Sequence, residues 1–296
     1  MRLRELERVA ARHVPGHGKA DIHLLSTGFV NETYRVVRDG RTFALRVAAA
    51  SGPSDLGLDR VWESRVLEHA VSAGLAPPLE YCDPQRGLLV MQWVEGRPWN
   101  SSDPGKPSNV SRMVDLMRRI HALPMPTPAR LMSPAMWIDR YCAAAVRTAG
   151  RKPGAAAVRE SAAALRTAAA VRLAALAALP TVDAVLCHSD LHALNLIDRG
   201  ASLVLLDWEY AHATDPLWDL AGWSTNNDFS AEQMHDLLES YARRPPTDEE
   251  HLRMRLLAWL YDYVCLLWCD LYPSASGQGG VRARAQLLEA RLLNLK

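Results

Sequence analysis

The sequence predicts an α+β fold: a small antiparallel sheet with one helix, followed by a larger and mainly helical part. Three observations carry this prediction. Short strand-like runs alternate with turn signals up to residue 94, whereas helical patterns dominate after residue 100. The chain has 296 residues, about half of them apolar, which is enough for two lobes. Glu95-Gly96-Arg97-Pro98 has the composition of a boundary, so we expect an N-terminal lobe at 1–93 and a C-terminal lobe at 97–296.

The elements of the N-terminal part follow from periodicity and turn chemistry. An amphipathic pattern over 3–13 predicts a helix that ends at Pro15-Gly16, and a second helix over 58–73 ends at Gly74. Asp39-Gly40 is a strong hairpin signal. Strands are predicted over 22–26, 30–37, 42–47, 79–82 and 88–94. Together they predict an antiparallel meander.

The C-terminal part is predicted to be helical, with a few short strands in its middle. One stretch, 155–179, is very rich in alanine, which has the best intrinsic helix propensity. Short apolar runs at 184–187 and 203–206 read as buried strands. Helices are predicted over 110–122, 136–149, 155–179, from 215 onward, and over 231–242, 248–271 and 280–293.

Composition argues against several classes of protein. The net charge of +1 gives no field that would attract nucleic acid or an anionic membrane. No run of about 18 uncharged apolar residues exists, and the charges at Arg2, Arg4, Glu5 and Glu7 are unlike a signal peptide. The five cysteines form no Cys-x-x-Cys pair, so we expect reduced thiols and a cytoplasmic protein.

One polar stretch, His188-Ser189-Asp190-Leu191-His192-Ala193-Leu194-Asn195, carries the strongest chemical signal. A turn at Asp198-Arg199-Gly200 predicts a hairpin that returns Asp207 to the side of Asn195. Phosphoryl transfer needs a carboxylate that orients the attacking hydroxyl, and oxygen ligands for Mg²⁺. Asp190 is therefore the predicted catalytic base, and Asn195 and Asp207 the predicted metal ligands. The order of these three residues is that of protein kinases.

Several spaced motifs agree with that chemistry. His-x-Asp-x-x-x-x-Asn is followed by Leu-Leu-Asp-Trp-Glu-Tyr-Ala at 205–211 and Asp-Pro-Leu-Trp-Asp-Leu-Ala at 215–221. This set resembles the aminoglycoside phosphotransferase/choline kinase superfamily, and within it the bacterial choline kinase and thiamine kinase branch. The resemblance implies a bilobal protein kinase-like fold that binds ATP and Mg²⁺ and transfers the γ-phosphoryl group directly. It also implies that His188 and Asp219 shape the catalytic loop.

The N-terminal lobe would bind the nucleotide phosphates. Gly28, in the first turn of the sheet, permits close approach of backbone N–H groups to an anion, and Asn31 stands where the family often carries an asparagine. Arg46 stands on the third strand, where protein kinases have lysine and choline kinase-like enzymes have arginine. Its predicted partner on the following helix is Glu63, with Glu68 as the competitor.

The adenine would lie against the segment that joins the lobes. By resemblance to the superfamily, Gln92 and Val94 would supply backbone hydrogen bonds to the base, and Met91 would lie at the back of the pocket. Simple core packing is the alternative for Met91.

Large rings are concentrated in the C-terminal part, and tryptophan and tyrosine can enclose an organic cation. Each ring alone is more simply a core residue, but the set favours a small cationic alcohol, with choline or ethanolamine as the first choice. The predicted acceptor-site residues are His192, Glu209, Trp218, Trp223, Trp259, Tyr263 and Trp268.

Other functions remain open at this point. Thiamine is the close rival as acceptor, followed by an aminoglycoside. A nucleotide-binding pseudokinase is a different class, as is a metal-dependent hydrolase that chelates its ion through His188, Asp190 and His192. A protein acceptor is disfavoured, because little chain separates Asp207 from the next helix. The sequence does not give the oligomeric state.

Overall fold

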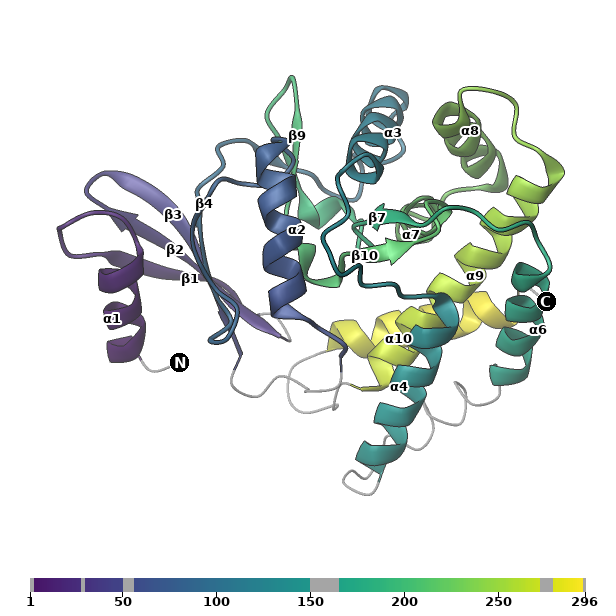
Figure 1. Cartoon of the computed structure of the whole chain (residues 1–296), viewed down its shortest axis with the longest axis horizontal. Helices are drawn as coiled ribbons and strands as arrows, with labels where there is room; N and C mark the ends of the chain where they lie inside the picture. Colours follow the sequence, from purple (N-terminus) through teal and green to yellow (C-terminus); the bar gives the residue numbers. More distant parts are fainter. Residues whose placement is uncertain (1–2, 28–29, 50–55, 150–164, 272–278, 295–296) are drawn as a thin grey trace. The chain divides into compact units, whose positions relative to one another are not determined.

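The computed structural model describes residues 3–27, 30–49, 56–149, 165–271 and 279–294 (Figure 1). The chain divides into two compact units. Unit 1 comprises Met1–Ser54, Leu58–Asn100 and Ala193–Tyr210, and unit 2 comprises Asp55–Gly57, Ser101–His192 and Ala211–Lys296. The predicted lobes were continuous stretches, whereas the segment Ala193–Tyr210 groups with the N-terminal sheet.

Unit 1 is built on a five-stranded antiparallel sheet with the strand order β1-β2-β3-β5-β4. Its strands are β1 (Asp21–Thr27), β2 (Asn31–Arg38), β3 (Arg41–Ala48), β4 (Leu79–Asp83) and β5 (Leu88–Gln92). Helices α1 (Leu3–His13) and α2 (Arg60–Ser72) lie on opposite sides of it (Figure 1). The α+β fold and the antiparallel sheet predicted from the sequence are therefore confirmed.

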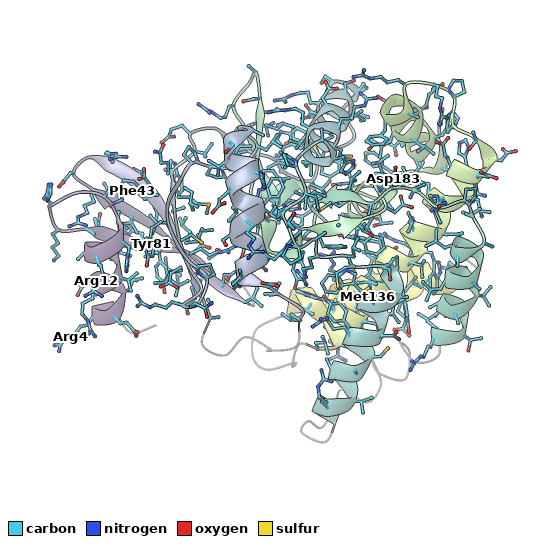
Figure 2. The ribbon with its side chains drawn as sticks, viewed as in Figure 1. Arg4, Arg12, Phe43, Tyr81, Met136 and Asp183 are labelled. Atoms are coloured by element: carbon cyan, nitrogen blue, oxygen red, sulfur yellow. The ribbon has the colours of Figure 1, made fainter. Side chains whose placement is uncertain are left out.

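Alternation along β3 explains why the two helices lie on opposite faces. Phe43, Leu45 and Val47 are buried in a core shared with α1, whereas Arg46 points to the other face, toward α2. Figure 2 labels Phe43 and also Tyr81, whose ring stacks on His13 at 3.9 Å between centroids. One face of the sheet is thus apolar, and the other carries a buried cation.

The C-terminal end of α1 is held by a buried arginine. Arg38 donates from Nη1 to the carbonyl oxygens of Ala10, Ala11 and Val14, at 3.2, 3.0 and 2.6 Å. Carbonyl groups at a helix end have no partner within the helix, and a cation also suits the negative end of the helix dipole. Arg38 therefore fastens α1 to the sheet.

A hairpin made of β8 (Leu196–Asp198) and β9 (Leu203–Leu205) completes unit 1. It pairs with β6 (Arg97–Pro98), and Leu205 N–H donates to Leu75 O at 2.8 Å. The turns η1 (Ala193–Asn195) and η2 (Trp208–Tyr210) adjoin its open end. There Leu206 N–H donates to Asn195 O at 2.8 Å, so the predicted return of the chain toward Asn195 is confirmed.

Unit 2 is mainly helical, and its strands β7 (Val185–Cys187) and β10 (His212–Thr214) pair in a two-stranded sheet. Helix α9 is central: it contacts α4, α6, α7 and α10 and is buried along most of its length. Of the predicted helix 155–179, residues 155–164 lie outside the described part. The helices are α3 (Pro107–His121), α4 (Pro134–Ala149), α6 (Arg166–Ala177), α7 (Leu217–Asn226), α8 (Ala231–Ala242), α9 (Asp248–Asp270) and α10 (Gly279–Asn294).

None of the helices in the described residues has both the length and the apolar content that a bilayer crossing requires.

Candidate active site

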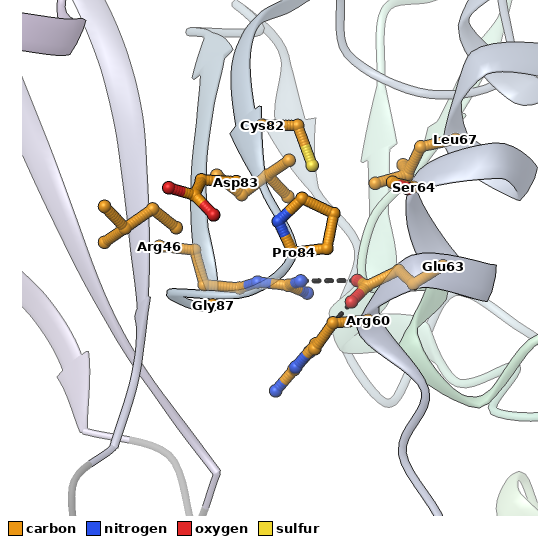
Figure 3. Close-up of a pocket in the computed structure, with 11 residues that line it drawn as sticks. Arg46, Arg60, Glu63, Ser64, Leu67, Cys82, Asp83, Pro84 and Gly87 are labelled. Atoms are coloured by element: carbon orange, nitrogen blue, oxygen red, sulfur yellow. Dashed lines mark hydrogen bonds and ion pairs between the residues drawn. The ribbon is translucent and has the colours of Figure 1, made fainter.

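In unit 1, Arg46 forms ion pairs with three carboxylates, those of Glu63, Asp207 and, at 3.9 Å, Glu209. Its guanidinium is hydrogen-bonded to Glu63 of α2 (Figure 3). Its Nη1 lies 2.9 Å from Oδ1 of Asp207. Glu63 is therefore the partner predicted from the sequence, while Glu68 is exposed. The Arg46 side chain is only 10% exposed, and its Nε–H has no partner among the described residues.

Arg60, which the sequence analysis did not single out, extends this network. Helix α2 begins there because Asp59 caps it by accepting Trp62 N–H at 2.9 Å. Figure 3 shows Arg60 beside Glu63, with 2.8 Å between Nη1 and Oε2. The spacing of Arg60 and Glu63, three residues apart in the first helical turn, was the available signal.

The other contacts of Arg60 reach the start of β2 and the segment after Asp207. Its Nη1 lies 2.8 Å from Glu209 Oε2, and its Nη2 donates to Asn31 Oδ1 at 2.8 Å. Asn31 in turn donates to Glu209 Oε2 at 2.6 Å. Glu209, predicted at the acceptor site, is instead 4% exposed and bound within this network of unit 1. Its carboxylate is therefore already paired within unit 1, and its role at an acceptor site stays a prediction.

The network contains two guanidinium groups and three carboxylates, so its carboxylates compete for positive charge. Burial and the neighbouring Asp207 raise the pKa of Glu209 to about 7, against the opposing effect of Arg46 and Arg60. Burial alone would also raise the pKa of Glu63, but the charges of Arg46 and Arg60 lower it. The cluster therefore keeps Glu63 ionised, whereas Glu209 is partly protonated near neutral pH.

Asn195 and Asp207 offer oxygen atoms of the kind that Mg²⁺ prefers. Asn195 is 8% exposed, and the Asp207 side chain is 38% exposed. Among the described residues, His121, Cys187 and Asp219 are the cluster of His, Cys, Asp or Glu side chains whose ligand atoms are close enough to share a metal. Asp207 is not part of this cluster. Few protein ligands suit Mg²⁺, which is usually held by one or two carboxylates together with substrate phosphates. The residues present thus fit a magnesium–nucleotide complex.

In unit 2, Asp219 of α7 holds the loop that carries Asp190. Its Oδ2 accepts His188 N–H at 2.9 Å, and its Oδ1 accepts Ser189 N–H at 2.7 Å. His188 is fully buried, and its Nδ1 accepts Asp190 N–H at 3.3 Å. The contacts suit the loop-shaping role predicted for His188 and Asp219. Ser189 adopts a left-handed φ of 67°, which a residue with a side chain rarely does without such restraint.

Asp190 itself is about one-third exposed and lies beside His192. The distance from its Oδ2 to Nε2 of His192 is 3.6 Å. Burial would raise the pKa of Asp190, but the interaction with His192 outweighs it and lowers the pKa to about 2. His192 therefore acts on the carboxylate rather than packing in the core.

The predicted adenine-binding residues lie on and after β5. Gln92 N–H already donates to Pro78 O at 2.8 Å, so the backbone of Gln92 could only accept a hydrogen bond from adenine, at its carbonyl oxygen. Met91 and Val94 are half-buried. Gly28 lies outside the described residues, and its predicted role has no structural account.

The large rings of unit 2 are core residues rather than the walls of an open cage. Trp259 and Tyr263 are 3% and 0% exposed and stack on each other, with 5.5 Å between centroids. Trp259 Nε1–H donates to Leu292 O at 3.4 Å, and Arg172 covers its ring. Trp218 and Trp223 are also buried, and Trp268 is half-buried. The burial of these rings favours core packing, because neighbouring helices surround α9. Their role in enclosing a cationic acceptor stays a prediction.

A protein-family model described as the phosphotransferase enzyme family (APH) matches residues 21–257. The chain belongs to this family. The matched range includes every element that holds Arg46, Asp190, Asn195 and Asp207, and it ends within α9.

Solved structures share the fold at low sequence identity. A choline/ethanolamine kinase family protein from Mesorhizobium loti is 23% identical, with a TM-score of 0.72 over 100% of this chain and 95% of that one. Choline kinase LicA from Streptococcus pneumoniae is 21% identical, with a TM-score of 0.72 over 98% and 96%. A spectinomycin phosphotransferase solved with ADP and spectinomycin is 12% identical, with a TM-score of 0.66 over 100% and 98%. LicA is also solved with AMP. The fold is therefore kinase-like.

Among curated proteins, LicA from Haemophilus influenzae is 28% identical over 88 residues. That match covers 28% of this chain and 33% of LicA, so it spans about a third of the length of this relative.

Proposed function

We propose that this phosphotransferase moves the γ-phosphoryl group of ATP to the hydroxyl group of a small alcohol. The observation that carries the proposal is the buried Arg46, which is paired with Glu63 and Asp207 within the unit that also contains Asn195. A buried cation beside oxygen ligands is what the transfer of a highly charged group requires.

Each polar residue has one role in the proposed reaction. Asn195 and Asp207 would hold the metal, and Arg46 would bind phosphate oxygens through its guanidinium fork while Glu63 and Arg60 fix its position. Bound Mg²⁺ would neutralise part of the negative charge on the phosphates. Asp190 orients the acceptor hydroxyl group and accepts its proton as the new oxygen–phosphorus bond forms and ADP leaves.

The low pKa of Asp190 defines that role further. A carboxylate with a pKa of about 2 is a weak base, so it takes little of the proton in the ground state. It is, however, fully ionised at neutral pH and accepts a strong hydrogen bond from the hydroxyl group. Asp190 therefore acts chiefly by orientation, which suits a loose transition state.

ATP is the proposed donor, and choline or ethanolamine is the proposed acceptor. The AMP bound by LicA and the ADP bound by the spectinomycin phosphotransferase support an adenine nucleotide. The similarity to choline and ethanolamine kinases supports a small amino alcohol. The aromatic residues no longer add support, because Trp259 and Tyr263 are buried. Thiamine and then an aminoglycoside are the alternatives.

The test is an assay with choline, ethanolamine, thiamine or spectinomycin as the acceptor, with and without Mg²⁺. It measures ATP consumption and the mass of the phosphorylated product. We expect Mg²⁺-dependent phosphorylation of an amino alcohol. Asp190→Asn should remove most turnover and leave ATP affinity largely intact, because Asp190 faces the acceptor in this scheme. Asp183→Asn, an exposed aspartate of the same unit, is the control. Equal turnover in Asp190→Asn and wild type would refute the assignment of Asp190.

A further inference from the structure

Behind the loop that carries Asp190, unit 2 contains a chain of polar groups to which the proposed reaction assigns no role. His121, the last residue of α3, has a side chain that is 4% exposed. Its Nε2 lies 3.2 Å from Oδ2 of Asp219, and its Nδ1 lies 2.7 Å from the hydroxyl oxygen of Tyr241 on α8. The chain therefore runs from Tyr241 through His121 and Asp219 to the backbone of the loop.

The hydrogen positions in this chain follow from the donors and acceptors. Burial would raise the pKa of Asp219, but the hydrogen bonds from His121 and from the amide of Ser189 lower it, so this carboxylate is ionised and only accepts. Nε2 of His121 must then carry the hydrogen. In the neutral imidazole Nδ1 accepts, and the hydroxyl group of Tyr241 donates to it. Tyr241 thus selects the tautomer that serves Asp219.

The carboxylate of Asp219 is surrounded by three donors. Oδ2 receives His121 Nε2–H and the amide of His188, and Oδ1 receives the amide of Ser189. A carboxylate rotates easily about its last bond, so a donor outside the loop is needed to fix the orientation in which it meets both amides. The left-handed backbone of Ser189 depends on that orientation, since it is held against its own preference.

We propose that His121 is a positioning residue for phosphoryl transfer. Together with Tyr241 it fixes the carboxylate of Asp219, and through the amides of His188 and Ser189 it fixes the direction of Asp190. The proposal rests on the function proposed above, because it assigns Asp190 a role in the reaction.

The contact between α3 and α8 sets the geometry of the chain. Arg118, one turn before His121 on α3, donates from Nη2 to the carbonyl oxygens of Ser240 and Tyr241. The guanidinium also lies over the Tyr241 ring, 5.7 Å from its centroid. The hydroxyl group of Tyr241 is therefore held at its place by a second contact between the same two helices.

The same buried group has the composition of a metal site, since the thiol of Cys187 lies 3.7 Å from His121 Nε2. A metal would require the lone pair of Nε2 and a thiolate. Nε2 is committed as a donor, and burial raises the pKa of Cys187 well above its usual range. Its thiol group instead donates to Asp215 O at 3.6 Å. The geometry thus favours a hydrogen-bonded relay, the chain from Tyr241 through His121 and Asp219 to the loop backbone, over a metal site.

Three variants and two measurements test the proposal. His121→Leu removes the relay, His121→Gln keeps an N–H group at the position of Nε2, and Tyr241→Phe removes only the hydroxyl group. We expect His121→Leu to lower kcat about tenfold or more with little change in the KM for ATP, and His121→Gln to recover most of it. Amide hydrogen exchange at His188 and Ser189 should be fastest in His121→Leu, slower in Tyr241→Phe, and close to the wild-type rate in His121→Gln.

His212→Leu is the matched control, because His212 is another buried imidazole of unit 2, 3.4 Å from Trp137 Nε1. It should destabilise the protein without accelerating exchange at Ser189. Wild-type kcat and exchange in His121→Leu, or changes no larger than those of the control, would overturn the proposal. Should His121→Leu fail to fold, His121→Gln and Tyr241→Phe decide in the same way.

Two outcomes distinguish this proposal from the proposed function and from a metal site. If the wild-type protein phosphorylates none of the acceptors, the proposed function fails, while amide exchange in the free protein still decides whether the relay exists. If the wild-type protein binds Zn²⁺ tightly in a titration and His121→Leu does not, the group is a metal site and the relay is wrong.

Discussion

Arg46 donates to Asp207, the carboxylate that the proposed reaction assigns to Mg²⁺, across 2.9 Å. A guanidinium group and a divalent cation compete for the same oxygen atoms, so if Asp207 binds Mg²⁺ as proposed, Arg46 would turn from Asp207 toward a phosphate group. The unpartnered Nε–H of Arg46 shows that the guanidinium is not saturated within the described residues. The ion pair with Glu63 would keep Arg46 in place.

Arg46→Lys should therefore raise the KM for ATP about tenfold, and Arg46→Ala should raise it further. Lysine carries the charge but lacks the planar fork that meets two carboxylates at once. Initial rates at varied ATP concentration measure the effect, and Arg41→Lys, an exposed arginine on the same strand, is the control. An unchanged KM in Arg46→Ala would remove Arg46 from the nucleotide site.

The raised pKa of Glu209 predicts how the stability of the free protein depends on pH. A carboxyl group with a pKa of about 7 in the folded state and an ordinary value of 4.5 binds more protons when folded. Its contribution to stability is complete below pH 4.5 and is lost as the pH rises through about 7. The unfolding temperature, measured without Mg²⁺ or nucleotide, should therefore fall less over this range in Glu209→Gln than in wild type. Glu68→Gln, an exposed glutamate, should behave as wild type; equal slopes in all three proteins would contradict the assignment.

Ser189 gives a test of backbone strain next to Asp190. At a φ of 67° glycine has no steric penalty, whereas other residues are disfavoured by roughly 1 kcal/mol. Ser189→Gly should leave stability unchanged or increase it by up to about that amount, offset by the greater entropy of the unfolded chain. Ser189→Val should destabilise the protein clearly, because a β-branched side chain resists this conformation. Chemical denaturation of the three proteins gives the comparison; greater stability of Ser189→Val would show that the backbone is not strained there.

Trp259 distinguishes a core residue from a wall of the acceptor site. Trp259→Ala should destabilise the protein by about 3–5 kcal/mol, as for other buried aromatic residues. Trp259→Phe removes the hydrogen bond to Leu292 and should cost about 1 kcal/mol without altering the KM for the acceptor. Trp268→Phe, at a half-buried position on the same helix, serves for comparison. A raised KM for the acceptor in Trp259→Phe, with unchanged stability, would instead support a role of Trp259 in binding the acceptor.

The sequence was most informative where local chemistry determines structure. Asp39-Gly40 and Asp198-Arg199-Gly200 predicted turns, and alternation predicted the strands that surround them. The analogy with the strand cation and helix glutamate of protein kinases predicted the ion pair between Arg46 and Glu63, which forms. In these cases few alternative conformations satisfy the same residues.

It was least informative where a residue's role depends on packing from distant segments. Glu209 was expected beside an acceptor, but its partners Arg60 and Asn31 lie more than a hundred residues earlier in the chain. His121 looks like an ordinary residue at a helix end until Asp219 and Tyr241 are placed around it. The rings of α9 face inward because neighbouring helices surround it, which sequence periodicity does not reveal for a helix that is buried on most of its surface.

The placement of Ala193–Tyr210 in unit 1 has a consequence for synthesis on the ribosome. The strand β6 and the carbonyl group of Leu75 emerge early, yet their partners in β8 and β9 are made much later. On the ribosome β6 and the carbonyl group of Leu75 therefore lack these partners until β8 and β9 have left the exit tunnel. Folding of the first unit is interleaved with that of the second, and a gene cut at the predicted boundary near residue 95 would yield two incomplete pieces.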